Sequence, residues 1–187
     1  MASIYLMLTF TGTLVSKCIG IYTGAKYTHV SICLDSRAQE FYSFGRKIRW
    51  FPLIGGFIVE HADSGLFKDF RNTTCAIFRL DVPEDKFEKL NKEIRLFVKD
   101  RQKYGYNLIG LIGVMLNRPL KRKNKYFCTE FVASVLQRAG IHDFQKDISL
   151  LKPQDFYNLP GFEHVYEGRL CDFGKSRVLP VGTAVVR

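Results

Sequence analysis

A cysteine stands where the sequence predicts the first turn of an amphipathic helix. Cys128 is followed by apolar residues at helical spacing, and Gly140 then supplies a stop signal. The first backbone N–H groups of a helix have no intrahelical partners, and the helix dipole is positive there. Both features favour the thiolate, which is the nucleophilic form of cysteine. The alternative is that Cys128 is a packed core residue, because free cysteines are commonly buried.

A cysteine nucleophile needs a base, usually a histidine, and the base needs an orienting group on its other ring nitrogen. His29 is the best placed of the four histidines, because it lies in a predicted strand, residues 27–34, that is otherwise built for the core. His61 follows Glu60 at the end of a predicted strand and is a second candidate, whereas His142 and His164 are expected near the surface. The alternative for His29 is a structural histidine whose hydrogen bonds are satisfied inside the sheet.

Glu40 is the predicted orienting carboxylate for His29. It lies eleven residues further along the chain and opens the returning strand of a predicted hairpin. A turn of that length can bring the two side chains to one face of the sheet. A carboxylate there would hold the imidazole tautomer and favour the imidazolium. The alternative is that Glu40 is a solvated turn residue.

The elements that must position these residues fall into two groups, with strands early in the chain and helices later. This order favours an α+β fold over a doubly wound α/β sheet. Strands are predicted at residues 3–10, 27–34, 40–44, 47–51, 57–61, 75–80 and 163–167, with a short helix at 14–22. Helices are predicted from Pro83 to Gly105 and from Cys128 to Gly140, with a helix or helix-like segment at 106–117 and the start of another turn at 152–155. The segment 106–117 is apolar nearly all round, which is typical of a buried helix.

The totals are those of one folded domain. A chain of 187 residues can bury one proper core, and 47% hydrophobic with 25% charged residues is ordinary for a globular protein. We find no repeat or linker and therefore expect a single domain over residues 1–187, with 170–187 as a candidate extended tail. The sequence leaves the oligomeric state open.

The cysteines and the N-terminus bear on cofactors and compartment. The five cysteines form no CxxC pair and no cluster with zinc-ligand spacing, so we expect no metal, no disulfide framework and a reducing compartment. No basic region precedes the first apolar run, and no apolar stretch is long enough to span a bilayer. The expected location is therefore the cytoplasm, without a transmembrane segment.

The charge balance points to an anionic partner or to a solvated basic surface. The formal net charge is +10, and the basic loop at residues 119–125 leads directly to Cys128. This loop would suit a substrate that carries a carboxylate or phosphate. Specific nucleic-acid binding is not expected, because the chain has the charge but no recognisable reading motif.

The order of these residues resembles that of the circularly permuted NlpC/P60 proteins, the YiiX/YebB-like group of papain-fold cysteine hydrolases related to lecithin retinol acyltransferase-like enzymes. In papain the cysteine precedes the histidine, whereas His29 precedes Cys128 here, as the permuted order requires. Residues 3–10, 152–155 and 165–168 resemble the opening and closing segments of the family. The resemblance rests on Tyr-Thr-His-Val-Ser-Ile at 27–32, a carboxylate on the next strand, Gly-Tyr-Asn at 105–107 and Cys-Thr-Glu-Phe-Val at 128–132.

The resemblance implies a permuted papain-like fold with an antiparallel sheet packed against helices. It implies Cys128 as nucleophile, His29 as base and Glu40 as the third polar residue. Tyr106, and with it Tyr27, would lie near the substrate or the oxyanion, although the backbone N–H of Cys128 is favoured as a donor on physical grounds.

The implied function is that of a thiol hydrolase of the amidase or peptidase type, acting without a cofactor on a small peptide, amide or acyl substrate. Cell-wall-type peptides are one expected substrate class. Two alternatives remain, namely a hydrolase or transferase of lipid or acyl esters, and a binding module without turnover.

Overall fold

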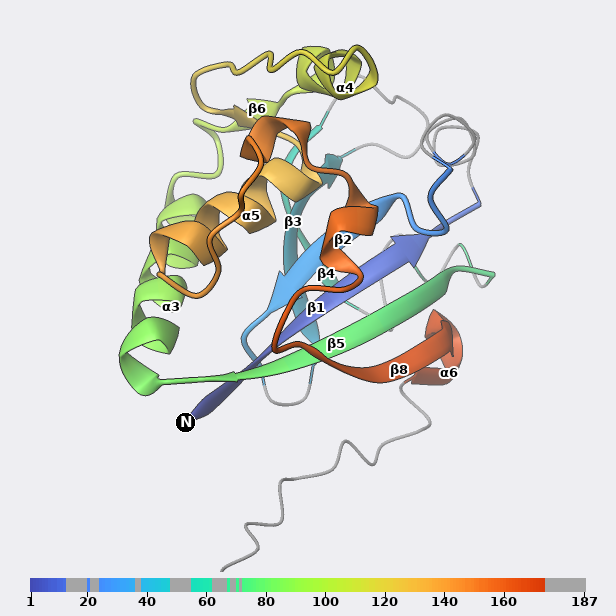
Figure 1. Ribbon diagram of the computed structural model, residues 1–187, viewed down its shortest axis with the longest axis vertical. Coiled ribbons are helices and arrows are strands. Elements are labelled where there is room, and N and C mark those ends of the chain that lie inside the picture. The colour runs from blue at the N-terminus through green and yellow to red at the C-terminus, as the bar shows by residue number, and fades with distance from the viewer. Residues whose placement is uncertain are drawn as a thin grey trace, which may run out of the picture.

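An eight-stranded sheet runs through the described part of the chain, which comprises residues 1–12, 20, 24–35, 38–47, 55–61, 67, 70 and 72–173 (Figure 1). The strand order is β7-β6-β4-β3-β2-β1-β5-β8. All neighbours are antiparallel except β6 and β7, so the sheet is mixed and not purely antiparallel as predicted. The strands are β1 Ala2–Phe10, β2 His29–Cys33, β3 Glu40–Arg46, β4 Gly55–His61, β5 Thr74–Val82, β6 Gly105–Tyr106, β7 Lys125–Tyr126 and β8 Glu163–Arg169.

Helices and strands are segregated along the chain, and the α+β class is confirmed. Figure 1 shows α3 and α5 next to one another against the sheet, α4 at one end of the molecule and the short α6 beside β8. The helices are α3 Glu84–Lys99, α4 Leu108–Met115, α5 Cys128–Arg138 and α6 Leu170–Phe173, with 3-10 turns η1 Ile148–Leu150 and η2 Pro153–Phe156.

The strand β1 is buried on both faces, which explains its continuous apolar sequence. Successive strand side chains point to opposite faces. Ile4, Leu6 and Leu8 belong to the core under α3 and α5, whereas Tyr5 and Met7 belong to a second cluster that includes residues of α6. β1 is therefore an interior strand of the sheet, paired with β2 on one side and β5 on the other, and both of its faces are covered.

Aromatic rings fill much of the space between the sheet and the helices, as the high phenylalanine content suggests. Phe131 of α5 lies 5.0 Å from Phe97 of α3 and 5.3 Å from Phe44 of β3, measured between ring centroids. Such edge-on and tilted pairs are favourable beyond their buried area. They hold α5 at a fixed distance from β3, and this fixes the position of the first turn of α5.

Most of the predicted elements are present at nearly the predicted bounds. The strands at 3–10, 27–34, 40–44, 57–61, 75–80 and 163–167, the helix that starts at Cys128 and the turn at 152–155 are confirmed. Gly140 follows α5 with a φ of +67°, the left-handed conformation that ends helices. The predicted helix at 14–22 and strand at 47–51 lie mostly outside the described residues, as does the tail beyond 173.

Two predictions about helices are wrong. The helix that follows Pro83 ends at Lys99 and not at Gly105, because Gly105 is paired with Gly56 in the sheet. The helix α4 is not buried, because it covers an end of the molecule and only its two glycines are buried. Its composition is that of a core helix, but the fold leaves three of its large side chains exposed and three half-buried. The exposed ones are Ile109, Ile112 and Met115.

The close approach of α4 to its surroundings requires glycine at position 110. A Cβ there would lie 2.4 Å from Nδ2 of Asn107 and 3.0 Å from Cε1 of Phe127. We therefore expect Gly110→Ala to lower the free energy of unfolding by about 1–3 kcal/mol, in spite of the better helix propensity of alanine. Gly105→Ala is the matched control, because its Cβ would meet Lys125 only at 3.7 Å. Urea unfolding of both variants tests this, and equal stabilities would contradict it.

Candidate active site

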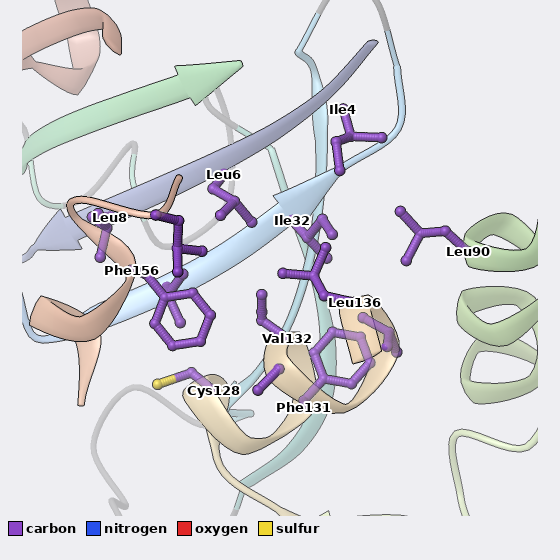
Figure 2. Packing of buried hydrophobic residues seen from close by; sticks show 14 of the residues in the cluster. Ile4, Leu6, Leu8, Ile32, Leu90, Cys128, Phe131, Val132, Leu136 and Phe156 are labelled. Atoms are coloured by element: carbon purple, nitrogen blue, oxygen red, sulfur yellow. The ribbon is translucent and has the colours of Figure 1, made fainter. Parts of the chain in front are cut away.

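Cys128 is the first residue of α5, as predicted. Phe127 is the N-cap in an extended conformation, and β7 ends directly before it. Figure 2 shows Cys128 at the start of the helix, while Val132 and Leu136 extend the buried cluster toward Ile32. Cys128 is buried, at 6% exposure. As the first residue of α5, it belongs to the turn whose N–H groups have no intrahelical partners.

A buried polar network that the sequence analysis missed anchors this first turn. Glu130 accepts a hydrogen bond from the backbone N–H of Phe127 and one of 3.4 Å from Nδ2 of Asn107. Asn107 also caps α4 by accepting a hydrogen bond from the N–H of Gly110 at 3.0 Å. Burial raises the pKa of Glu130, and its hydrogen bonds oppose this only in part. The available signal was the position of Glu130, three residues after the N-cap, where a glutamate can reach back to the N-cap N–H.

His29 begins β2 and contacts both Cys128 and a carboxylate. Its Nε2 lies 3.0 Å from Oε2 of Glu60, and the two side chains are 19% and 10% exposed. A side-chain hydrogen bond links the imidazole to Cys128. Burial lowers the pKa of His29, but the charge of Glu60 and the hydrogen bonds with both partners outweigh this and raise the pKa well above its usual value. The imidazolium is therefore the favoured form.

The carboxylate that contacts His29 is Glu60 and not Glu40, so the predicted partner is wrong. Ile32 of β2 is opposite Tyr42 of β3. Continued along the strands, this register places Glu40 opposite Leu34, five residues or roughly 16 Å from His29. Glu40 instead accepts a hydrogen bond from the Tyr42 hydroxyl at 2.9 Å. The hairpin was predicted correctly, but its register sends Glu40 to the far end.

Tyr106 lies near Cys128 because of the β6–β7 pairing. Tyr106 is opposite Tyr126, two residues before Cys128, and the N–H of Asn107 donates to the carbonyl of Tyr126 at 2.9 Å. Burial and the neighbouring Cys128 raise the pKa of Tyr106 well above its usual range, against the opposing charge of Arg46. The phenol is therefore a neutral hydrogen-bond donor beside the thiol.

Tyr27 belongs to a different network. Its hydroxyl donates to Oε1 of Glu167 at 2.7 Å, and its ring stacks on Tyr157 at 6.1 Å. Lys26 and Tyr157 also donate to Glu167, and hydrogen bonds from Lys26 first and Tyr27 next lower the pKa of this carboxyl to about 2. The structure thus assigns the Tyr27 hydroxyl to Glu167 and not to Cys128.

The other histidines stand apart from the Cys128–His29 pair. His61 is opposite Glu40 in the β3–β4 ladder, and His164 lies 3.4 Å from Glu167.

Within the described residues, no group of three or more His, Cys, Asp or Glu side chains could hold a metal ion. Across the same residues, no helix combines the length and the apolar character needed to cross a membrane.

Glu60 lines a cleft of about 580 Å³, and neither Cys128 nor His29 is among the described residues that line it. Three cationic side chains, Arg46, Lys47 and Arg101, line it together with His61 and Glu60. Glu60 therefore both lines the cleft and contacts His29, and the charge of Arg46 reaches Tyr106. The other described lining residues are Phe57, Ile58, Val59, Phe67, Val98 and Gln102.

No family model matches this chain, and no curated protein matches it.

Proposed function

We propose that this protein is a thiol hydrolase that cleaves an amide or related acyl bond through Cys128, His29 and Glu60. The observation that carries the proposal is that His29 contacts both the sulfur at the start of α5 and a mostly buried carboxylate. A nucleophile, a base and an orienting group in mutual contact are the parts that nucleophilic acyl transfer requires.

The mechanism begins with the thiolate–imidazolium pair that forms when the Cys128 proton moves to His29, and the raised pKa of His29 favours this pair. Because Nε2 of His29 faces Glu60, Nδ1 is the ring nitrogen that remains for Cys128. The thiolate attacks the substrate carbonyl, and the imidazolium then returns the proton to the leaving amine or alcohol as the C–N or C–O bond breaks. Water attacks the thioester, giving one proton to His29 and releasing the acid, which restores the thiolate–imidazolium pair.

Two kinds of donor can stabilise the oxyanion. The first backbone N–H groups of α5 have no intrahelical partners and belong to the turn that begins at Cys128. The neutral phenol of Tyr106 is a second donor, because β6 pairs with β7 directly before Cys128. Glu130 and Asn107 act as positioning residues, because they hold the first turn of α5 and the start of α4 in register.

The permuted papain-like scaffold is part of this proposal. Its support is the order of the site residues, with the histidine on a strand before the cysteine at a helix start, and the α+β architecture of sheet and covering helices. With Glu60 in place of the predicted Glu40 as the third site residue, the carboxylate comes from β4 and not from β3. The chemical role of the carboxylate is unchanged.

The substrate class that fits the site is an acylated molecule with a carboxylate or phosphate. Arg46, Lys47 and Arg101 line the cleft next to Glu60, and their charges favour an anion there. A small peptide of the cell-wall type has both the amide bond and the carboxylates. An acyl ester that carries a phosphate would meet the same requirements.

Alkylation by iodoacetamide at neutral pH tests the proposal without a known substrate. We expect Cys128 to react at least about ten-fold faster than Cys171, although Cys171 is the more exposed thiol. The reason is that Cys128 has a histidine partner and lies at a helix start. Rates come from mass spectrometry of the labelled peptides.

The control for this experiment is His29→Ala, which should remove the advantage of Cys128 over Cys171. Faster labelling of Cys171 in the wild-type protein would overturn the proposal. A Cys128→Ala variant separates an enzyme from a binding module. An enzyme would lose turnover while keeping its fold and its affinity for the ligand, whereas a binding module would keep its function.

A further inference from the structure

The helix α4 carries a set of exposed large apolar side chains that the proposed chemistry does not use. Each is between 36% and 63% exposed. They follow helical spacing on α4 and continue just beyond its end, at the end of the molecule that Figure 1 shows farthest from α6. These residues are Ile109, Ile112, Met115, Leu116 and Leu120. A cluster of this kind on a protein surface usually marks an interaction site.

The same surface is strongly basic. Residues 101–129 contain seven Lys or Arg and no Asp or Glu. Of these cations, Arg118, Lys121, Arg122 and Lys123 are exposed directly after α4. Lys121 pairs with Asp147 at 2.9 Å. We call the five apolar residues and these four cations the α4 surface.

Backbone contacts make the apolar and basic parts of the α4 surface one unit. The N–H of Arg118 donates to the carbonyl of Gly113 at 2.8 Å, and Nδ2 of Asn107 donates to the carbonyl of Leu120 at 3.2 Å. A Cβ at Gly113 would lie 2.5 Å from the carbonyl oxygen of Arg118, so the chain after α4 is packed against the helix. The cations therefore lie beside the exposed apolar side chains and not at a distance from them.

The exposed apolar side chains and the cations of the α4 surface together favour an anionic lipid bilayer over a second copy of the chain or a nucleic acid. A second copy of the chain in a two-fold interface would bring two basic loops together, which is unfavourable. A nucleic acid would pair with the cations but leave the apolar side chains in water. An anionic lipid bilayer meets both requirements, because apolar side chains enter the interface while lysines and arginines pair with acidic headgroups.

We propose that the α4 surface docks this protein on the surface of an anionic lipid bilayer. The apolar side chains of α4 insert at the level of the headgroups, and the loop after α4 supplies the attraction. Because Asn107 caps α4 and also bonds Glu130, docking holds the first turn of α5 near the lipid–water interface. The proposal is independent of the thiol chemistry, and its test involves no turnover.

Co-sedimentation with vesicles tests this proposal. The full chain is mixed with vesicles of phosphatidylcholine alone, or with 30% phosphatidylserine, at low and high salt. We expect binding to the anionic vesicles that weakens at high salt, and little binding to the neutral ones. Ile112→Glu should lower the partition coefficient at least about ten-fold. Lys123→Glu should lower it about five-fold or more.

Matched controls lie on α3. Leu96 is 45% exposed, close to the 49% of Ile112, and Lys92 is an exposed lysine. Leu96→Glu and Lys92→Glu should bind anionic vesicles nearly as well as the wild type, and so should Cys128→Ala. Circular dichroism establishes that each variant is folded.

Several outcomes would overturn the proposal. They are no binding of the folded wild type to anionic vesicles, equal binding to neutral vesicles, or equal losses in the α3 and α4 variants. Self-association that Ile112→Glu abolishes, without vesicle binding, would assign the surface to a second copy instead. Retention on nucleic acid in place of vesicles would likewise reject the lipid assignment.

Discussion

Glu60→Gln is expected to lower the rate of acylation at Cys128 about 100-fold or more. The glutamine preserves the shape of the side chain but removes the charge that raises the pKa of His29. It can also stabilise the wrong imidazole tautomer, because its amide presents both a donor and an acceptor to Nε2. The measurement is the rate of labelling by an activated acyl ester at neutral pH, followed by mass spectrometry.

Glu40→Gln is the matched control for this prediction, because Glu40 was the carboxylate that the sequence indicated. The Glu40 carboxylate accepts a hydrogen bond from Tyr42 and lies far from His29, so we expect labelling within two-fold of the wild type. A large loss in Glu40→Gln, or none in Glu60→Gln, would contradict the assignment of Glu60.

The second large effect is on stability and its pH dependence. The pKa of His29 is raised in the folded protein, so the His29–Glu60 pair contributes stability that is fully present below the unfolded pKa of about 6.5. This stability is lost as the pH rises through the higher pKa of the folded state. Because both side chains are mostly buried, Glu60→Gln at pH 6 should lower the free energy of unfolding by about 3 kcal/mol.

Urea unfolding between pH 6 and pH 9.5 measures this effect. The difference between the wild type and Glu60→Gln should be largest at pH 6 and should shrink as the pH rises. Glu40→Gln should differ from the wild type by a small amount that does not change over the same range. A difference for Glu60→Gln that is constant with pH would mean that His29 is not the titrating partner.

Local sequence patterns predicted the elements that carry the site. The apolar run of β1, the strand that begins at His29 and the helix that begins at Cys128 follow from hydrophobic spacing and stop signals within short windows. The chemistry of cysteine nucleophiles then paired two residues that are 99 positions apart in the chain. The packing of α5 against β2 brings them together.

The choice of Glu60 over Glu40 depended on the tertiary structure. Local reasoning favoured the nearest carboxylate on the returning strand, but contact across strands depends on register and on the twist of the sheet. Glu60 lies on β4, which is separated from β2 by β3. No short segment contains both residues, so no local pattern could have identified the pair.

The exposure of α4 was likewise decided by the tertiary structure. Apolar composition predicts burial only when another element is available to cover the helix, and α4 lies at the end of the molecule with only its glycines buried. The sequence by itself thus determined which segments are strands and helices and which thiol begins a helix, because these depend on neighbours in the chain. The partner of His29 and the exposed face of α4 depend on contacts between distant segments, which only the packed sheet and helices define.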